Sequence, residues 1–545
     1  MKDIVTEDEN FDIEKFIPVI RARITTNNPF VRQFLLGWIM VLDSVPDIDM
    51  LVYLPQFLDG LFSMLSDPNK EIEKQACTVI DEFVSEIETV ADAVEYESLV
   101  PILITHCQSQ VNLAKQKALH WIYKFLFAAN NFEKNIGPKK DPKQLLLPFH
   151  CIMLQAILPN LSHPSDDIRS ITIIANTELT KMVSTCNQVS YKDFLTIIGK
   201  EIQNYNVQTR VASLVWLELL LNKDDQQVLK QMNKPFEVKL LQCLGDADDR
   251  VVNLNLKVLA SISVTNEDNF VKVLSLLTRL FRSEDILLKR AGYIIRELSV
   301  MLNPENIFRV FARILLSNDK EQQLPISDYD DNVKEVSSTS LMTHLEFCSV
   351  MVQTLNTILL TSKELTDLRK LVKKGLSTPE SGELFLILYK SWCHNPVATL
   401  SLCLLSKAYK HASALVASFA EIEITVSFLV QIDNLVQMLE SPIFADLRLQ
   451  LLEPQKNPYL LKTFYGILML LPQGPAYDKL NRRLECVNTL SLLHLIDRKD
   501  LNNSITQNGH SRNATEDTED KESTELLKHF SSIQKAHKRT YNADL

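Results

Sequence analysis

A helical hairpin that recurs about every 40 residues is the feature that most restricts the fold of this chain. The second helix of each hairpin is expected to begin in the segments 29–39, 70–80, 112–122, 167–176 and 207–217. In register, these segments place Arg32, Glu73, Lys115, Arg169 and Arg210 at intervals of 41, 42, 54 and 41 residues. The long interval contains an insertion at 130–144, whose Gly, Pro and Lys content indicates a solvated loop. Two looser copies follow at 248–262 and 285–298.

The spacing of apolar residues predicts helices within each repeat. Segment 71–88 carries seven apolar side chains on one helical face: Ile72, Ala76, Val79, Ile80, Phe83, Val84 and Ile87. A second apolar stripe precedes it in 54–65 and stops at Asp67-Pro68, because proline cannot extend a helix. We find no convincing strand pattern with a period of two. The sequence therefore predicts an all-α fold.

A single helical hairpin cannot bury its apolar face, and stacking against neighbouring hairpins completes the core. The period and the two helices per unit predict a HEAT-repeat superhelical solenoid over residues 1–316. Phe83 and Trp216 are expected between stacked hairpins. Repeat folds of this kind present surface rather than a pocket, which favours a binding scaffold over an enzyme at the level of the fold.

The repeat pattern weakens after residue 316. Residues 317–340 are polar and lack periodicity, as in a linker or long loop. Helical periodicity resumes in 341–500 without the 40-residue spacing, which predicts a non-repeat C-terminal helical region for partner binding and oligomerisation. The tail 501–545 is expected to be mostly disordered, with a short helix near 523–539 that carries Leu526, Phe530 and Ile533 on one stripe.

Composition excludes several classes of function. Only 11 of the 545 residues are glycine, so phosphate-binding and dinucleotide-binding loops have little material. The net charge of −11 opposes binding to nucleic acid. Nine scattered cysteines indicate a reducing compartment, and the acidic N-terminus is unlike a secretory signal. These features predict a cytoplasmic protein whose membrane contact is peripheral.

Candidate reactive groups are few. Cysteine and histidine are adjacent at His106-Cys107, His150-Cys151 and Cys393-His394, but neighbours on a helix point about 100° apart, so adjacency is no evidence of activation. No cysteine is followed by arginine at the spacing of a phosphatase loop. We expect no catalytic residue, no metal site and no cofactor.

Several segments of the chain are specific enough to compare with a known family. They are 31–72, 355–365, 390–405, 419–453 and 457–472, together with a weaker match at 525–537. These segments resemble the vacuole-morphology family of scaffolds that includes ArPIKfyve. The resemblance covers nearly the whole chain. Relative to this family the chain is expected to lack upstream HEAT repeats, because it starts just before the unit at 29–39.

The resemblance implies a non-catalytic scaffold for a PIKfyve-type phosphoinositide kinase and a Sac-domain phosphoinositide phosphatase. Such an assembly controls the synthesis and turnover of phosphatidylinositol 3,5-bisphosphate. The implied location is cytoplasmic and peripheral on endosome and vacuole or lysosome membranes, and the implied partners include further copies of the chain. An alternative is a HEAT-type adaptor that binds cargo or a small GTPase in membrane traffic.

Three neighbourhoods in 341–500 are the candidate partner-binding sites. Each is a break with a polar residue followed by proline, where a helix must end and present side chains. The residues are His394, Asn395 and Pro396; Ser441, Pro442, Ile443 and Phe444; and Asn457, Pro458 and Tyr459. The family resemblance is densest in this region, and it implies that the phosphatase binds there.

Overall fold

The structure is a computed structural model that describes residues 12–45, 48–89, 94–131, 141–186, 188–282, 287–317, 343–487 and 514–543. Within these ranges the regular structure is helical, with no strand. The contacts divide the chain into two compact units, Met1–Ile262 and Ser263–Leu545, and this division falls inside the last helix of the first unit. The expectation of an all-α fold is confirmed.

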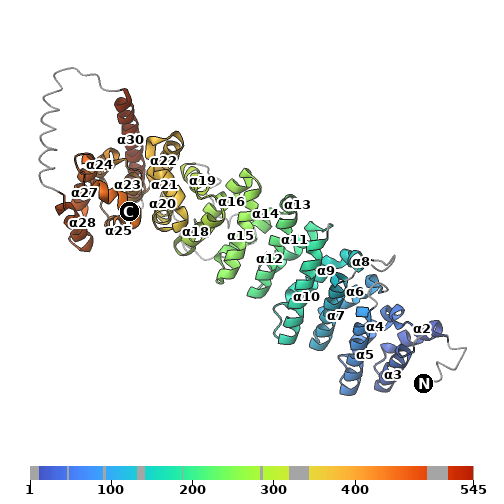
Figure 1. The fold of residues 1–545 in the computed structure, drawn as a ribbon. Helices are drawn as coiled ribbons and strands as arrows, with labels where there is room; N and C mark the ends of the chain where they lie inside the picture. Colours follow the sequence, from blue (N-terminus) through green and yellow to red (C-terminus); the bar gives the residue numbers. More distant parts are fainter. Residues whose placement is uncertain are drawn as a thin grey trace, which may run out of the picture. The chain divides into compact units, whose positions relative to one another are not determined.

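The first unit consists of helical hairpins (Figure 1). Its α-helices are α2 Ile13–Ile24, α3 Pro29–Asp43, α4 Leu54–Met64, α5 Lys70–Thr89, α6 Tyr96–Cys107, α7 Asn112–Asn131, α8 Pro142–Leu146, α9 His150–Asn160, α10 Asp166–Thr185, α11 Tyr191–Glu201, α12 Val207–Lys223, α13 Asp225–Gln231, α14 Lys234–Gln242 and α15 Asp249–Thr265. Short 3-10 turns lie at η1 Met50–Val52, η2 Leu147–Phe149 and η3 Cys243–Gly245.

The predicted second helices begin where the repeat register places them. Helices α3, α5, α7 and α12 start at the first residue of their predicted segments, and α10 starts one residue earlier. First helices pack on first helices (α2 on α4, α4 on α6, α6 on α9, α9 on α11), and second helices pack on second helices (α3 on α5, α5 on α7, α7 on α10, α10 on α12). This two-layer stack is the HEAT-type arrangement.

Side chains that the pattern placed inward are buried. All seven residues of the α5 stripe are at most 3% exposed. Phe83 and Trp216 are each 1% exposed, and the indole nitrogen of Trp216 donates to Asn176 Oδ1 of α10 at 2.8 Å. The prediction that both aromatics lie between stacked hairpins is confirmed.

Arginines at one position of the repeat tie each hairpin to its own turn and to the next hairpin. Arg32, Arg169 and Arg210 each donate to the backbone carbonyl six residues earlier, at 2.9, 3.1 and 2.8 Å. Arg32 also pairs with Asp67, and Arg210 pairs with Asp246, in the following turn. Neither Glu73 nor Lys115, which share the register, makes such a pair within the described residues.

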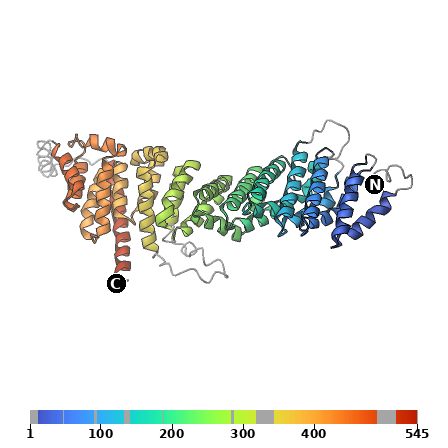
Figure 2. The same ribbon diagram turned by 90° about the horizontal axis from the view of Figure 1, so that it is seen from below.

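The second unit also consists of helical hairpins (Figure 2). Its α-helices are α16 Glu267–Leu280, α18 Gly292–Met301, α19 Pro304–Leu316, α20 His344–Thr361, α21 Thr366–Lys373, α22 Pro379–Trp392, α23 Pro396–Leu405, α24 Tyr409–Ser418, α25 Val426–Leu439, α26 Ala445–Gln450, α27 Pro458–Leu470, α28 Pro475–Glu485 and α30 Ala514–Ala543. Shorter turns are a π-helix, η4 Leu287–Ala291, and the 3-10 turns η7 Lys363–Leu365, η8 Gly375–Ser377, η9 Phe419–Glu421 and η10 Pro442–Phe444.

The C-terminal helices differ from the sequence expectation in their packing. Helix α18 packs on α20, α20 on α23, α23 on α25 and α25 on α28, while α16 packs on α19 and α19 on α22. A two-layer stack is therefore present where a non-repeat region was predicted. The helices that form the α18-to-α28 layer begin at 292, 344, 396, 426 and 475. Their uneven spacing, with extra helices such as α21 and α26 between them, hides the repeat from a search for a fixed period.

Two predicted segments fall mainly outside the described residues. They are the linker at 317–340, beyond residue 317, and the central part of the insertion at 130–144. The tail is described only over 514–543, where α30 is longer than the short helix predicted near 523–539. The predicted domain boundaries stay predictions.

Candidate functional site

The adjacent cysteine and histidine pairs have structural surroundings. The ring of His106 stacks on Phe62 at 4.7 Å between centroids, and its Nε2 lies 2.9 Å from Asp59 Oδ1. Burial raises the pKa of the Cys107 and Cys393 thiols, and it raises the pKa of Cys151 to about 12. Because the thiolate is the nucleophile, these three cysteines are poor reaction centres at neutral pH.

The first candidate neighbourhood forms the corner between α22 and α23. Asn395 caps α23, since its Oδ1 accepts the backbone N–H of Ala398 at 3.0 Å. Its Nδ2 donates to Gln431 Oε1 of α25 at 2.9 Å, and Pro396 occupies the first turn, where proline fits. His394 and Asn395 are only 7% and 2% exposed. This corner is part of the packed interior of the second unit.

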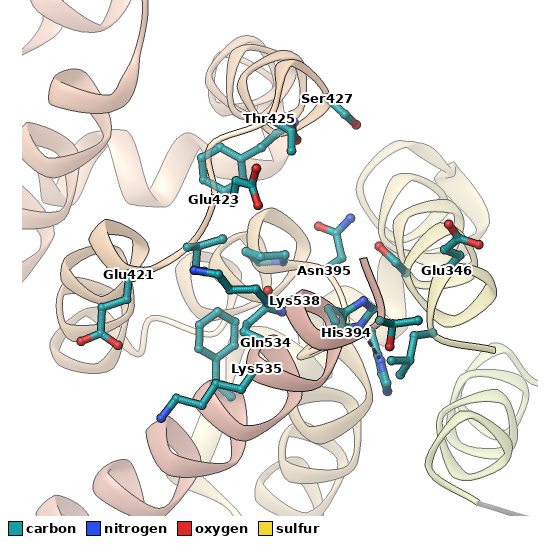
Figure 3. A pocket seen from close by; sticks show the side chains of 18 of the residues that line it. Glu346, His394, Asn395, Glu421, Glu423, Thr425, Ser427, Gln534, Lys535 and Lys538 are labelled. Carbon is teal, nitrogen blue, oxygen red and sulfur yellow. Dashed lines mark hydrogen bonds between the residues drawn. The ribbon is translucent and has the colours of Figure 1, made fainter. Parts of the chain in front are cut away.

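The C-terminal helix α30 lies against that corner and closes one side of a cavity (Figure 3). The cavity has a volume of about 470 Å³ and lies between the start of α20, the 394–396 corner, the loop from η9 into α25, and α30. Glu421 and Glu423 lie on the loop side, and Lys535 and Lys538 lie on α30. The walls therefore carry both signs of charge.

A pair of histidines joins the corner to α30. His394 Nδ1 lies 3.1 Å from His537 Nε2, and the ring centroids are 5.3 Å apart. Burial, followed by the nearby His537, lowers the pKa of His394 to about 3. Burial also lowers the pKa of His537, although Glu346 acts in the opposite direction. Both rings are therefore neutral at pH 7 and share one hydrogen bond.

The second neighbourhood, Ser441–Phe444, follows the end of α25. Pro442, Ile443 and Phe444 form η10, and Phe444 is buried at 2% exposure. Arg448 donates to the carbonyl oxygens of Leu439 and Ser441, the latter at 2.7 Å. The guanidinium thus satisfies carbonyls that the ended helix leaves without partners.

The third neighbourhood, Asn457–Tyr459, begins α27 and lies close to α26. Asn457 Nδ2 donates to Gln450 O at 3.4 Å. Tyr459 is 43% exposed, and two leucines between the second and third neighbourhoods, Leu449 and Leu452, are 64% and 65% exposed. We call Leu449, Leu452 and Tyr459 the α26–α27 patch. Sequence reasoning missed both leucines, because they belong to a segment of mixed apolar and polar residues with no helical stripe of its own.

The structure does not bring the three neighbourhoods together. The second and third lie on either side of α26, whereas the first lies at the opposite end of α25. The 14 residues of α25 span about 20 Å. The first neighbourhood is covered by α30, and the α26–α27 patch is open on the described surface.

In the part of the chain that the structure describes, no cluster of three or more His, Cys, Asp or Glu side chains is arranged to hold a metal ion. No described helix is both long enough and apolar enough to cross a membrane. Together, the stacked hairpins, the unreactive cysteines and the open apolar patch define a helical-repeat protein with an interaction surface.

The family model for the binding region at the C-terminus of "Vacuolar protein 14" matches residues 284–487. "Protein VAC14 homolog" of Arabidopsis thaliana is 42% identical over 90% of this chain and 61% of its own length. "Protein VAC14 homolog" of Schizosaccharomyces pombe is 31% identical over 97% of this chain and 68% of its own length. "Vacuole morphology and inheritance protein 14" of Saccharomyces cerevisiae is 26% identical over 98% of this chain and 69% of its own length.

The chain belongs to the VAC14 family. It spans about three fifths to two thirds of the length of these three relatives. Among solved structures, Kap121p matches with a TM-score of 0.31 at 11% identity, over 86% of this chain and 50% of that chain. A score this low does not define a relationship between folds.

Proposed function

We propose that this protein is a non-catalytic scaffold that binds a Sac-domain phosphoinositide phosphatase through its C-terminal helical region. The observation that carries the proposal is the match of residues 284–487 to a family defined by partner binding at the C-terminus of vacuolar protein 14. The sequence resemblance implies that the partner bound there is the phosphatase. The stacked helices of the second unit provide a rigid base for such a surface. The unreactive surroundings of the described cysteines support a binding role rather than catalysis.

The α26–α27 patch is the preferred contact surface for the phosphatase. Leu449, Leu452 and Tyr459 are exposed and lie inside the matched range. Exposed leucines beside a tyrosine, at the edge of a fixed helical stack, are the type of anchor that protein interfaces bury. The residues Ser441, Pro442, Ile443, Asn457 and Pro458 border this patch, whereas His394, Asn395 and Pro396 become available only when α30 moves.

Co-purification with the phosphatase tests this surface. The double variant Leu452→Asp with Tyr459→Ala is expected to bind at least tenfold more weakly, because buried interface anchors each contribute about 1–2 kcal/mol. The matched control is Val264→Asp with Tyr205→Ala, whose original side chains are 72% and 83% exposed and lie outside 284–487. Equal capture by both variants would move the contact away from this patch.

The proposed assembly also contains a PIKfyve-type kinase and further copies of this chain, and it acts on phosphatidylinositol 3,5-bisphosphate at endosomal and vacuolar membranes. Co-expression with kinase and phosphatase, followed by mass measurement of the purified complex, gives the partners and their copy numbers. The purified chain alone is expected to leave ATP with phosphatidylinositol 3-phosphate, and the bisphosphate, unchanged. Turnover that persists through stringent purification would contradict the scaffold role.

A further inference from the structure

Helix α30 contacts the second unit through one stripe of side chains. Ser523, Leu526, Phe530, Gln534 and His537 follow each other at spacings of three or four residues, which is the pattern of a helix seated in a groove. Leu526 and Phe530 are 8% and 1% exposed. The stripe is therefore a complete docking face, apolar in the middle and polar at both ends.

The groove supplies a partner for each polar end of the stripe. At one end Ser523 Oγ lies 2.9 Å from His411 Nδ1 of α24. In the middle, the ring of Phe530 lies 6.4 Å from that of Phe419. Towards the other end, Gln534 Nε2 donates to the carbonyl oxygen of Cys393 at 2.7 Å. The groove is formed by α22, α24, η9 and the 394–396 corner.

The last contact of the stripe cannot survive full protonation. A hydrogen bond between two imidazoles needs one nitrogen that donates and one that accepts, and a protonated imidazole has no acceptor. His394 and His537 are 3.1 Å apart, so two imidazolium ions there would repel each other in a poorly solvated site. His411, at the opposite end, is also buried and touches both Ser523 and Tyr389.

The charged groups around the histidine pair do not compensate for added protons. Glu346 is the carboxylate that acts on His537, and it already accepts from the backbone N–H and hydroxyl of Thr343. His344 and His529 act on His394 in the opposite direction. Other charged side chains on the cavity wall are Glu421, Glu423, Lys535 and Lys538, and Arg282 donates to His344.

We infer that α30 is a detachable cover for a helix-binding groove, and that protonation of His394 and His537 releases it. The groove recognises an amphipathic helix through an apolar pair flanked by polar groups, and its occupant here is the chain's own C-terminal helix. Release exposes the 394–396 corner and the cavity beside it. The inference is independent of which partner binds the α26–α27 patch.

The size of the effect follows from proton linkage. When the pH falls from 7.5 to 5.5, proton binding favours a released histidine of ordinary pKa, about 6.5, by about tenfold, while a docked histidine with a much lower pKa gains almost nothing. Because the docked pKa of His394 is about 3, this histidine alone shifts the equilibrium towards release by about tenfold. His537, with its lowered pKa, increases the shift further.

Hydrogen exchange on the full chain measures release directly. The protection factor of amides in 526–537 is compared at pH 7.5 and pH 5.5, after correction for the intrinsic pH dependence of exchange. We expect α30 protection to fall at least tenfold at pH 5.5, while protection of α27 stays within threefold. An unchanged value for α30, or an equal fall in α27, would overturn the inference.

Variants show whether the histidine pair is the sensor. His394→Gln with His537→Gln retains hydrogen-bonding side chains that do not titrate, so its fall in protection should be at least tenfold smaller than that of the unmodified chain. The matched control is His529→Gln on the same helix, whose ring makes a long contact of 3.4 Å to Lys390 O. This control should behave as the unmodified chain does. A double variant with the full original pH response would overturn the inference.

Discussion

The Arg210–Asp246 pair is expected to hold neighbouring hairpins of the first unit together. Arg210 Nη2 donates to Asp246 Oδ1 at 3.0 Å, and Nε lies 2.7 Å from Oδ2. The two side chains are 14% and 11% exposed. Asp246 also accepts the backbone N–H of Asp248 at 2.9 Å, so one carboxylate fixes both the turn and the preceding hairpin.

The magnitude follows from the burial of the pair. Removing one partner of a buried ion pair costs about 3–5 kcal/mol, whereas exposed pairs contribute about 0–1 kcal/mol. Since both side chains retain some solvent contact, we expect Asp246→Ala to lower the local opening free energy by about 2–4 kcal/mol. The loss should be confined to adjacent hairpins, because repeat arrays are stabilised by interfaces between neighbours.

Native-state hydrogen exchange of peptides from α12 and α15 provides the assay. A double-mutant cycle with Arg210→Met and Asp246→Ala isolates the pair from the turn contact. The control cycle uses Lys70 and Glu73, whose side chains are 84% and 24% exposed and which should show a coupling of at most about 0.5 kcal/mol. If the two cycles gave the same coupling, burial would not be the source of the stabilisation.

Four further predictions concern packing, thiols and pH. Trp216→Ala should cost about 3–5 kcal/mol in chemical unfolding, since it empties a buried site and leaves Asn176 without its indole donor. Gly60→Ala should lower the melting temperature, because a Cβ there would lie 2.6 Å from Ile24 Cγ2, whereas Gly37→Ala meets nothing within 4 Å and should raise it. A thiol reagent should modify exposed Cys486 before buried Cys107 and Cys403, as peptide mass mapping over time would reveal. Burial alone would raise the pKa of Asp67, but the N–H of Asn69 and the guanidinium of Arg32 lower it, so its stabilisation holds above about pH 4 and is lost as the pH falls further; the destabilisation by Asp67→Asn, measured by urea titration, should therefore shrink below that pH.

Local patterns were sufficient for the hairpins of the first unit. The second helices start at or within one residue of their predicted segments, because apolar periodicity and helix caps act over a few neighbouring residues. The register that aligned Arg32, Arg169 and Arg210 also marked residues with one shared role, the contact with the carbonyl six residues earlier. The role itself was not readable from spacing.

The sites illustrate the opposite situation. The three neighbourhoods were chosen as helix breaks, and all three lie at helix boundaries, yet their exposure ranges from 2% at Asn395 to 43% at Tyr459. Exposure depends on what covers a turn, and the cover over Asn395 and His394 involves α30, more than a hundred residues later. The stripe of α30 was partly visible as Leu526, Phe530 and Ile533, but its groove was not.

The sequence by itself determined the helical class of the chain, the hairpins of its first unit and, through family resemblance, a scaffold role. The tertiary structure decided that hairpin stacking extends through 343–487 without a fixed period, and that α30 rather than solvent meets His394. The difference has one physical cause. Helix formation depends on residues a turn apart, whereas burial of a corner, pairing of two histidines and exposure of a patch depend on contacts between segments that are distant along the chain.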